Sequence, residues 1–245
     1  MFDEIIRECL SGFGMEIDGA QLARLGQFSD FLLEKNKVMN LTAIKEPGEV
    51  ARRHMADSLF LYTCADLRGK RILDIGTGAG FPGMPLKLYD PELDITMLDS
   101  TAKRINFINE AAARQGIEVS TIAARAEEAV KELRGSFDIV TSRAVAPLNI
   151  LTELSMPFLK KDGLFLPMKS FNDAEAEEES RAARAIAFMG GRLEGRREYS
   201  VEPGVKCQVL VIRRVAPSPK GYPRSYAAIS KKPLYGCQGI DRAAC

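Results

Sequence analysis

The stretch RILDIGTGAGFPG, which runs from Arg71 to Gly83, decides the fold of this chain. Its first five residues are mostly apolar and include Asp74, which is typical of a buried strand with an acidic residue near its end. Three glycines at alternate positions and Pro82 follow, and they predict a tight loop and the start of a helix. Glycine lets a ligand lie against the backbone, and a helix start offers unpaired N–H groups. We therefore expect this loop to bind a ligand.

The spacing of the glycines indicates which ligand. The phosphate loop G-x-x-x-x-G-K-[ST] is absent, and the dinucleotide fingerprint G-x-G-x-x-G lacks its third glycine because Phe81 stands there. The pattern present is acidic-x-Gly-x-Gly-x-Gly, formed by Asp74, Gly76, Gly78 and Gly80, and it resembles the first motif of class I S-adenosylmethionine (AdoMet) methyltransferases. AdoMet has an amino group and a sulfonium but no phosphate, so a nearby carboxylate suits it. The alternative is a strand–helix turn whose glycines serve only packing.

A second acidic residue supports the same ligand. Asp99 ends a predicted strand over residues 94–98, 25 residues after Asp74. In a doubly wound fold, a carboxylate about 20 residues beyond the glycine loop binds ribose hydroxyl groups. An N-cap role in the next helix is the alternative, since Asp favours that position, and the two roles are compatible.

The order of predicted elements indicates the architecture. Strands are predicted at 71–75, 94–98, 117–122, 137–142, 163–168, 192–201 and 206–214, and helices at 82–89, 102–115, 126–133, 147–157 and 173–189. Strands separated by helices favour a parallel sheet. The expected fold class is therefore α/β, the Rossmann-like class I AdoMet-dependent methyltransferase fold, with a mostly parallel seven-stranded sheet and an antiparallel last strand.

Helical periodicity precedes the sheet. Apolar residues recur at helical spacing in 2–13, about 19–37 and about 47–64, with Asp18 as a plausible N-cap of the second helix. We expect three parts. Residues 1–66 form a helical lead-in packed on the catalytic domain, 67–215 form the AdoMet-binding methyltransferase domain, and 216–245 form a basic C-terminal tail.

Composition limits the possible functions. The 245 residues suit one core. The net charge is +1, but residues 203–245 hold eight Lys and Arg against one Asp, so the first 202 residues carry −6. A basic tail of this kind suits an anionic partner.

The five cysteines are odd in number and form no C-x-x-C pair, so we expect neither a disulfide framework nor a metal site. No signal peptide or long apolar run is visible, so a cytoplasmic protein without membrane contact is expected. A monomer is the default expectation.

Basic residues follow three of the predicted strands. Arg125, Arg143 and Lys169 each come directly after a strand, where the ligand crevice of an open α/β sheet lies. We expect them to converge with Asp74 and Asp99 on one rim. Because Arg and Lys are the usual partners of phosphates, the set suggests a polyanionic substrate beside the AdoMet site. Surface charges that happen to end strands are the alternative.

From about Phe28 to Leu234 the chain resembles the RsmG (GidB) family of bacterial 16S ribosomal RNA methyltransferases. The resemblance is carried by Asn40–Ile44 (NLTAI), Arg53–Ser58 (RHMADS), Asp74–Pro85, Leu98–Ser100, Lys103–Arg104, Arg125–Glu128, Ser142–Ala144, Met168–Lys169 and the tail segments 219–224 and 231–234. A glycine loop alone would indicate only an AdoMet enzyme. The NLT and RHxxDS motifs ahead of it make the resemblance specific.

The resemblance implies transfer of a methyl group from AdoMet to N7 of a single guanine in the 530 loop of 16S rRNA, as RNA or within the 30S subunit. By the family's pattern, the residues that touch AdoMet would be Gly76, Phe81, Ala126, Glu127 and Arg143. Those on the catalytic, RNA-facing side would be Asn40, His54, Arg125 and Lys169. Guanine N7 has no proton to remove, so this reaction needs positioning and desolvation more than a general base.

Two other functions stay open on the sequence alone. One is an AdoMet-dependent methyltransferase that acts on another RNA, a protein or a small molecule, and the other is an RNA-binding module that no longer transfers methyl groups. A dehydrogenase is disfavoured by Phe81. Residues 235–245 have no counterpart in the family, and removal of the chain after Val215 is expected to weaken RNA binding and its salt dependence.

Overall fold

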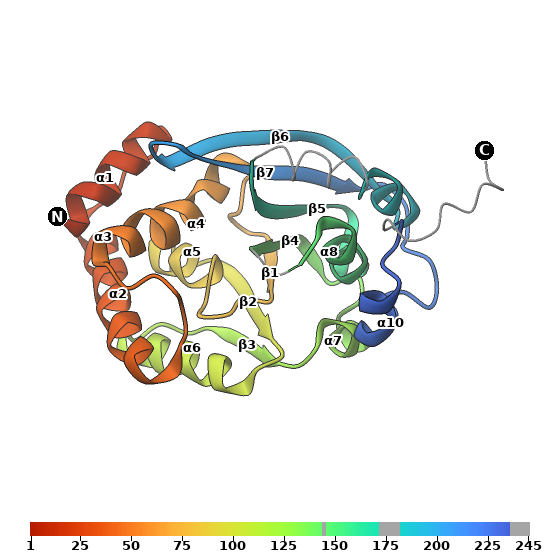
Figure 1. Ribbon diagram of the computed structural model, residues 1–245, viewed down its shortest axis with the longest axis horizontal. Helices are drawn as coiled ribbons and strands as arrows, with labels where there is room; N and C mark the ends of the chain where they lie inside the picture. The colour runs from red at the N-terminus through yellow and green to blue at the C-terminus, as the bar shows by residue number, and fades with distance from the viewer. Residues whose placement is uncertain (144–145, 172–181, 236–245) are drawn as a thin grey trace.

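The computed structural model of the chain describes residues 1–143, 146–171 and 182–235 (Figure 1). One sheet of seven strands has the order β3-β2-β1-β4-β5-β7-β6. The strands are β1 (Arg71–Ile75), β2 (Asp94–Asp99), β3 (Ser120–Ala123), β4 (Phe137–Arg143), β5 (Leu159–Ser170), β6 (Gly191–Glu202) and β7 (Val205–Arg214). Strands β1 to β5 pair in parallel, and β7 pairs antiparallel with both β5 and β6. The predicted fold class is confirmed.

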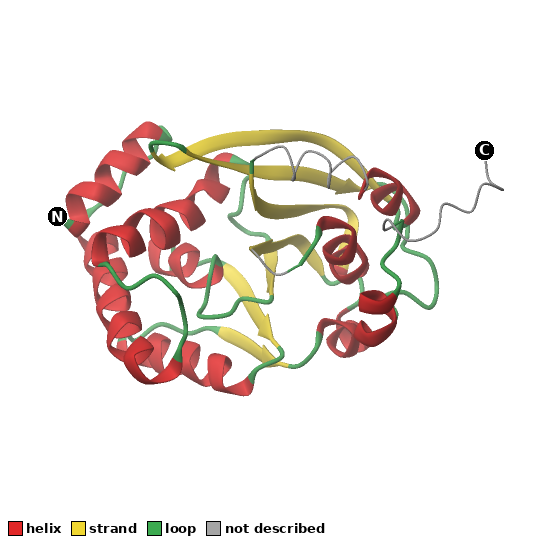
Figure 2. Cartoon of the chain, viewed as in Figure 1, coloured by secondary structure: helices red, strands yellow, loops and turns green. Residues whose placement is uncertain are grey.

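Helices precede the sheet and alternate with its strands (Figure 2). They are α1 (Phe2–Gly12), α2 (Gly19–Met39), α3 (Pro47–Val50), the π-helix η1 (Ala51–Ala56), α4 (Asp57–Leu59), η2 (Phe60–Thr63), α5 (Gly83–Tyr89), α6 (Ala102–Arg114), α7 (Ala126–Leu133), α8 (Leu148–Ser155), η3 (Met156–Phe158) and α10 (Tyr226–Lys231). Residues 182–188 are also helical, and the first part of the helix predicted at 173–189 lies outside the described residues. In the described ranges, no helix is both long and apolar enough to cross a bilayer.

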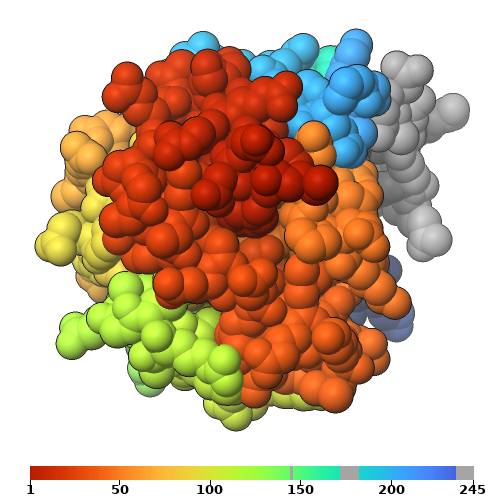
Figure 3. Space-filling view, turned by 90° about the vertical axis from the view of Figure 1, so that its left-hand side faces the viewer, coloured from red at the N-terminus to blue at the C-terminus, as the bar shows by residue number. Residues whose placement is uncertain are grey.

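Alternating side chains give the sheet two apolar faces. Ile72 and Ile139 belong to one core cluster, which the N-terminal helices, α5 and α6 complete. Leu73 and Val140 belong to the other, completed by α7, α8, residues 182–188 and α10. The fold is therefore a three-layer sandwich in which the N-terminal helices are part of one outer layer. Figure 3 shows the side of the molecule that they cover.

The start of α2 is fixed by local sequence. Asp18 Oδ1 accepts a hydrogen bond from the backbone N–H of Gln21 (2.7 Å), and the Gln21 side chain accepts one from the backbone N–H of Asp18 (2.8 Å). This reciprocal capping box confirms Asp18 as the N-cap. The predicted helix at 47–64 is instead divided into α3, η1, α4 and η2, with a π-helical turn at Ala51–Ala56. Such turns occur often at functional sites.

Replacement of Gly80 by Ala should destabilise the protein. Gly80 has φ +91, and an added Cβ would lie 2.6 Å from Cγ of Met84. Backbone strain of this kind costs about 1–3 kcal/mol, so we expect a loss of that size in the free energy of unfolding, measured by urea titration. Gly195→Ala is the control, because nothing lies within 4 Å of its added Cβ. Equal urea midpoints for the Gly80 variant and the unaltered protein would contradict this account.

Candidate functional site

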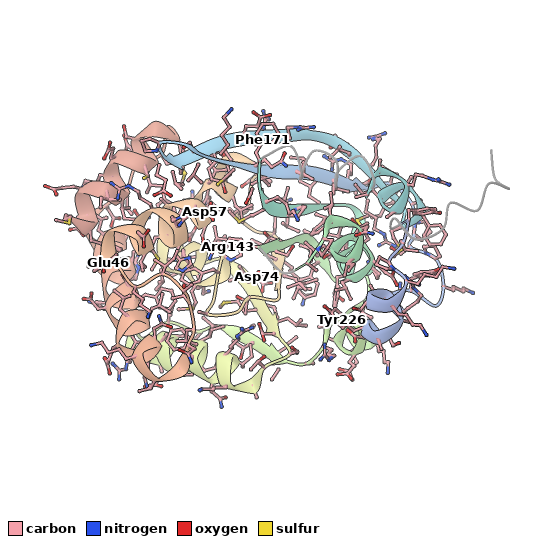
Figure 4. The ribbon with its side chains drawn as sticks, viewed as in Figure 1. Glu46, Asp57, Asp74, Arg143, Phe171 and Tyr226 are labelled. Carbon is pink, nitrogen blue, oxygen red and sulfur yellow. The ribbon has the colours of Figure 1, made fainter. Side chains whose placement is uncertain are left out.

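A cavity of about 380 Å³ opens at the carboxyl ends of the parallel strands, where open α/β sheets bind ligands. It is bordered by the glycine loop, the ends of β2 and β4, the start of α7, η1 and α10. Its lining includes Thr42, His54, Gly76, Gly78, Phe81, Asp99, Arg104, Arg125, Ala126, Glu127, Arg143 and Tyr226. Figure 4 shows Arg143 near the centre of the molecule and Tyr226 at the start of α10.

The glycine loop is held against the end of β2. The N–H of Gly76 donates to the carbonyl of Leu98 (2.8 Å), and the N–H of Gly78 donates to Oδ2 of Asp99 (2.9 Å). Oδ1 of Asp99 accepts from the N–H of Thr101 (2.8 Å), just before α6. The Asp99 carboxylate therefore has a fixed orientation at the cavity wall and also supports the turn into the next helix.

Asp74 is fully buried behind the glycine loop and does not face the cavity. Its Oδ2 accepts from Oγ1 of Thr77 (2.6 Å) and from the N–H of Gly83, the first residue of α5 (2.9 Å). Burial raises the pKa of the Asp74 carboxyl to about 6, against the effect of these two donors. Asp74 thus shapes the cavity by tying the loop to α5.

Arg143, the last residue of β4, connects η1 to the sheet. Its Nη1 donates to Oδ2 of Asp57 (2.9 Å) and to the carbonyl of Arg53 (2.9 Å), and its Nη2 lies 3.0 Å from Nδ1 of His54. From β6, the hydroxyl of Tyr199 donates to the other oxygen of Asp57 (2.7 Å). The charge of Arg143 is therefore paired, and the N-terminal region is fixed to two strands at the cavity.

His54 is held as a neutral imidazole. Nδ1 of His54 lies 3.0 Å from Nη2 of Arg143 and 3.2 Å from the carbonyl of Arg53. Because a guanidinium can only donate and its contact is the shorter one, we assign Nδ1 as the acceptor and place the proton on Nε2, which donates to Oγ1 of Thr42 (2.8 Å). The ring stacks on Phe81, with 4.3 Å between centroids. Burial and the nearby charge of Arg143 lower the pKa of His54 to about 3. With both nitrogens engaged, His54 positions its neighbours and does not serve as a general base.

A second cavity of about 390 Å³ adjoins the first and shares His54 and Arg143 with it. Lys169, Tyr199 and Cys207 are among its lining residues. Burial raises the pKa of the Cys207 thiol to about 11, and burial together with Asp57 raises the pKa of Tyr199 well above its usual value. Both groups remain protonated near neutral pH, so the thiol is no nucleophile there.

The predicted site residues fall into four groups. Those that line the first cavity are His54, Gly76, Gly78, Phe81, Asp99, Arg125, Ala126, Glu127 and Arg143, and Lys169 lines the second. Asp74 lies behind the glycine loop, and Gly80 belongs to the loop but is not among the lining residues of the cavity. Asn40 is exposed at the C-cap of α2 with φ +51, two residues before Thr42.

The first cavity suits AdoMet. Asp99 and Glu127 bring carboxylates that would repel a polyphosphate but can accept hydrogen bonds from hydroxyl or amino groups. Ile75, Leu98 and Phe81 add apolar surface for a flat ring. In the part of the chain that the structure describes, no group of three His, Cys, Asp or Glu side chains could hold a metal ion.

Comparison of the sequence with known proteins shows which family the chain belongs to. The family described as rRNA small subunit methyltransferase G, GidB, matches residues 21–193. This chain belongs to the GidB family. It is 42% identical to the ribosomal RNA small subunit methyltransferase G of Lachnoclostridium phytofermentans, over 92% of this chain and 94% of that protein. It is 39% identical to the protein of that name from Lactococcus lactis, over 95% and 98% respectively. The resemblance seen in the sequence is confirmed.

Solved structures agree with the fold of this GidB-family chain. The PH0226 protein from Pyrococcus horikoshii OT3 has a TM-score of 0.54 and 17% identity, covering 74% of this chain and 98% of that one. The BH2331 protein from Bacillus halodurans C-125 has a TM-score of 0.52 and 18% identity, covering 66% and 100%. At these identities the likeness concerns the fold alone.

The cavity residues of the GidB-family chain that were not predicted include Thr42, Asp57, Tyr199 and Tyr226. Thr42 and Asp57 stand inside the motifs that carry the resemblance, so their neighbours in sequence were a usable signal. Tyr199 and Tyr226 had no such signal, because each meets its partner from far along the chain. The partner of Tyr199 is 142 residues away, and that of Tyr226 is 99 residues away.

A proton NMR titration can test the state of His54, which is the only histidine of the chain. We expect its imidazole signal not to shift between pH 8 and pH 5, because the folded pKa is about 3. The unfolded chain takes up this proton first, with a pKa of about 6.5. The stability that neutral His54 contributes is therefore present above about pH 6.5 and is lost as the pH falls toward 3.

The same NMR titration of His54 in the Arg143→Gln variant is the matched comparison. Removal of the neighbouring positive charge should raise the pKa of His54, while burial should keep it below 6.5. A titration midpoint near pH 6.5 in the unaltered protein would contradict the buried, neutral imidazole.

Proposed function

We propose that this protein transfers a methyl group from AdoMet to N7 of a single guanine in the 530 loop of 16S rRNA. Membership of a family described as rRNA small subunit methyltransferases supports the reaction class and the substrate. The choice of N7 and of the 530 loop rests on the NLT and RHxxDS motifs, which carry the family resemblance. The substrate brings the protein to the cytoplasm, where ribosomal subunits assemble, and we expect it to act as a monomer.

The observation that carries the proposal is the meeting of two cavities at His54 and Arg143. The first has the glycine loop and the carboxylates of Asp99 and Glu127, which suit the ribose and adenine of AdoMet. The second has Lys169 at its wall and suits a nucleotide of the RNA. Two ligands in these cavities would approach each other at the shared residues.

The residues between the cavities fit a reaction that needs no base. AdoMet supplies an electrophilic methyl group on its sulfonium, and guanine N7 attacks with a lone pair and loses no proton. His54 is neutral with both nitrogens engaged, and Tyr199 and Cys207 stay protonated. The stacked rings of Phe81 and His54 keep an apolar surface at the junction. These residues therefore orient the reactants and exclude water.

Methyl transfer from labelled AdoMet to 30S subunits that lack this modification tests the proposal, with naked 16S rRNA alongside. We expect label at N7 of one guanine, located by nuclease mapping. Label elsewhere would overturn the assigned nucleotide. With no label on either substrate, AdoMet binding would indicate a protein or small-molecule substrate, and its absence would indicate an RNA-binding module.

Lys169→Ala should lower kcat/KM for rRNA by about tenfold or more, because a charge-assisted contact to RNA contributes about 1.5–3 kcal/mol. AdoMet affinity, measured by calorimetry, should be retained, since Lys169 lines only the second cavity. Lys161→Ala, an exposed lysine on the same strand, is the control. Equal kcat/KM for the Lys169 variant and the unaltered enzyme would show that Lys169 does not contact the RNA.

The basic C-terminal segment has three exposed lysines available to RNA, namely Lys220, Lys231 and Lys232. Arg224 is instead paired with Glu153. Replacing the three lysines with Ala should reduce the slope of log affinity against log salt by about 2–3, because each phosphate contact contributes about 0.7–0.9. Filter binding of rRNA over a salt series measures this slope. An unchanged slope would show that these lysines do not contact the RNA.

A further inference from the structure

Residues 216–235, which we name the C-terminal strap, fold back over the layer formed by α7 and α8 (Figure 1). The hydroxyl of Ser218 donates to the carbonyl of Met189 (2.9 Å), and Ile229 of α10 is fully buried in the apolar cluster of that layer. The strap is therefore part of the packed structure, and its three lysines remain exposed.

A buried ion pair fixes the strap. The Glu153 carboxylate of α8 is fully buried, and Arg224 binds it as a fork, with Nε to Oε1 at 2.8 Å and Nη2 to Oε2 at 2.6 Å. The backbone N–H of Arg224 donates to Oε1 as well (3.0 Å). A buried carboxylate is tolerated only when it is paired and hydrogen-bonded, so α8 requires the strap in this place.

Two residues after Arg224, the strap reaches the first cavity. Tyr226 lines the cavity together with Ala126 and Glu127. Its backbone N–H donates to Oε1 of Glu127 (3.0 Å), and its ring lies 5.3 Å from the guanidinium of Arg125. Tyr226 is 37% exposed as a residue and lines the cavity, so part of it is open to a ligand at the cavity edge.

We propose that Tyr226 is a cofactor-binding residue that contacts the adenosine part of AdoMet, an inference that rests on the proposed function. Tyr226 lines the first cavity beside Glu127 and Ala126, and it is absent from the lining of the second. Figure 4 shows Tyr226 apart from Arg143, which belongs to the His54–Arg143 junction where the methyl group must face the RNA. An aromatic ring away from that junction suits a purine, because bases stack on aromatic side chains.

The strap also positions Glu127. One oxygen of the Glu127 carboxylate is occupied by the backbone of Tyr226, which leaves Oε2 to accept from a ligand. Replacement of the Tyr226 side chain keeps this backbone contact, so a side-chain variant reports on the ring alone.

Calorimetric titration with S-adenosylhomocysteine and with 5′-methylthioadenosine tests the proposal on the full chain. We expect Tyr226→Ala to weaken both ligands by about tenfold, because the purine would lose its stacking on the aromatic ring. Tyr226→Phe keeps the ring and should stay within about twofold of the unaltered protein. In turnover, the loss should appear in KM for AdoMet and not in KM for rRNA.

Tyr235→Ala is the matched control. Tyr235 is a strap tyrosine of similar exposure, 41%, and its ring lies against Phe188, 6.2 Å between centroids. Its replacement should leave the affinity for both ligands within about twofold.

Three outcomes would overturn the proposal. Equal affinities for Tyr226→Ala and the unaltered protein, with methyl transfer intact, would remove Tyr226 from the cofactor site and leave the proposed function standing. A loss of affinity confined to S-adenosylhomocysteine would show that the Tyr226 ring contacts the amino-acid part of the ligand and not its adenosine. Failure of the unaltered protein to bind either ligand would overturn the proposed function together with this inference.

Discussion

The pairing of Arg143 with Asp57 is the interaction on which the site depends. It joins the end of β4 to the N-terminal helices, and Tyr199 brings β6 to the same carboxylate. Both charged side chains are largely buried, with 15% and 11% exposure, so loss of either partner would leave an unpaired charge at a cost of about 3–5 kcal/mol. The same guanidinium fixes the tautomer of His54. The sheet alone therefore cannot form the junction between the two cavities.

Elements set by local rules were predictable from the sequence. The apolar run before the glycines became β1, and the pair Asp18 and Gln21 began α2. Elements set by distant contacts were not. The π-helical turn at Ala51–Ala56 depends on packing against α1 and β6, which no local pattern encodes. Strand β5 extends to Leu159, beyond its predicted start, through an irregular register opposite β4 around Phe137.

The candidate site divides in the same way. Gly78 and Asp99 were predictable because strand, loop and acidic strand end follow a fixed spacing, and the structure joins them by a hydrogen bond. Asp74 also fits the spacing of the acidic-x-Gly-x-Gly-x-Gly pattern. The direction of its side chain, toward a ligand or behind the loop, depends on the turn that covers it, and the spacing does not specify this. Tyr226 is held at the cavity by the pairing of Glu153 with Arg224, and a pairing between a helix and a loop distant in sequence leaves no local pattern.

The Glu153–Arg224 pair also matters during synthesis on the ribosome. Its two partners are 71 residues apart, and at about 5–20 residues per second the carboxylate of α8 waits roughly 4–14 seconds for its guanidinium. Until then, the layer that contains α8 cannot close without burying an unpaired charge. A chain that ended before Arg224 would therefore leave Glu153 without its partner, and we expect its incomplete layer to be open to cellular proteases.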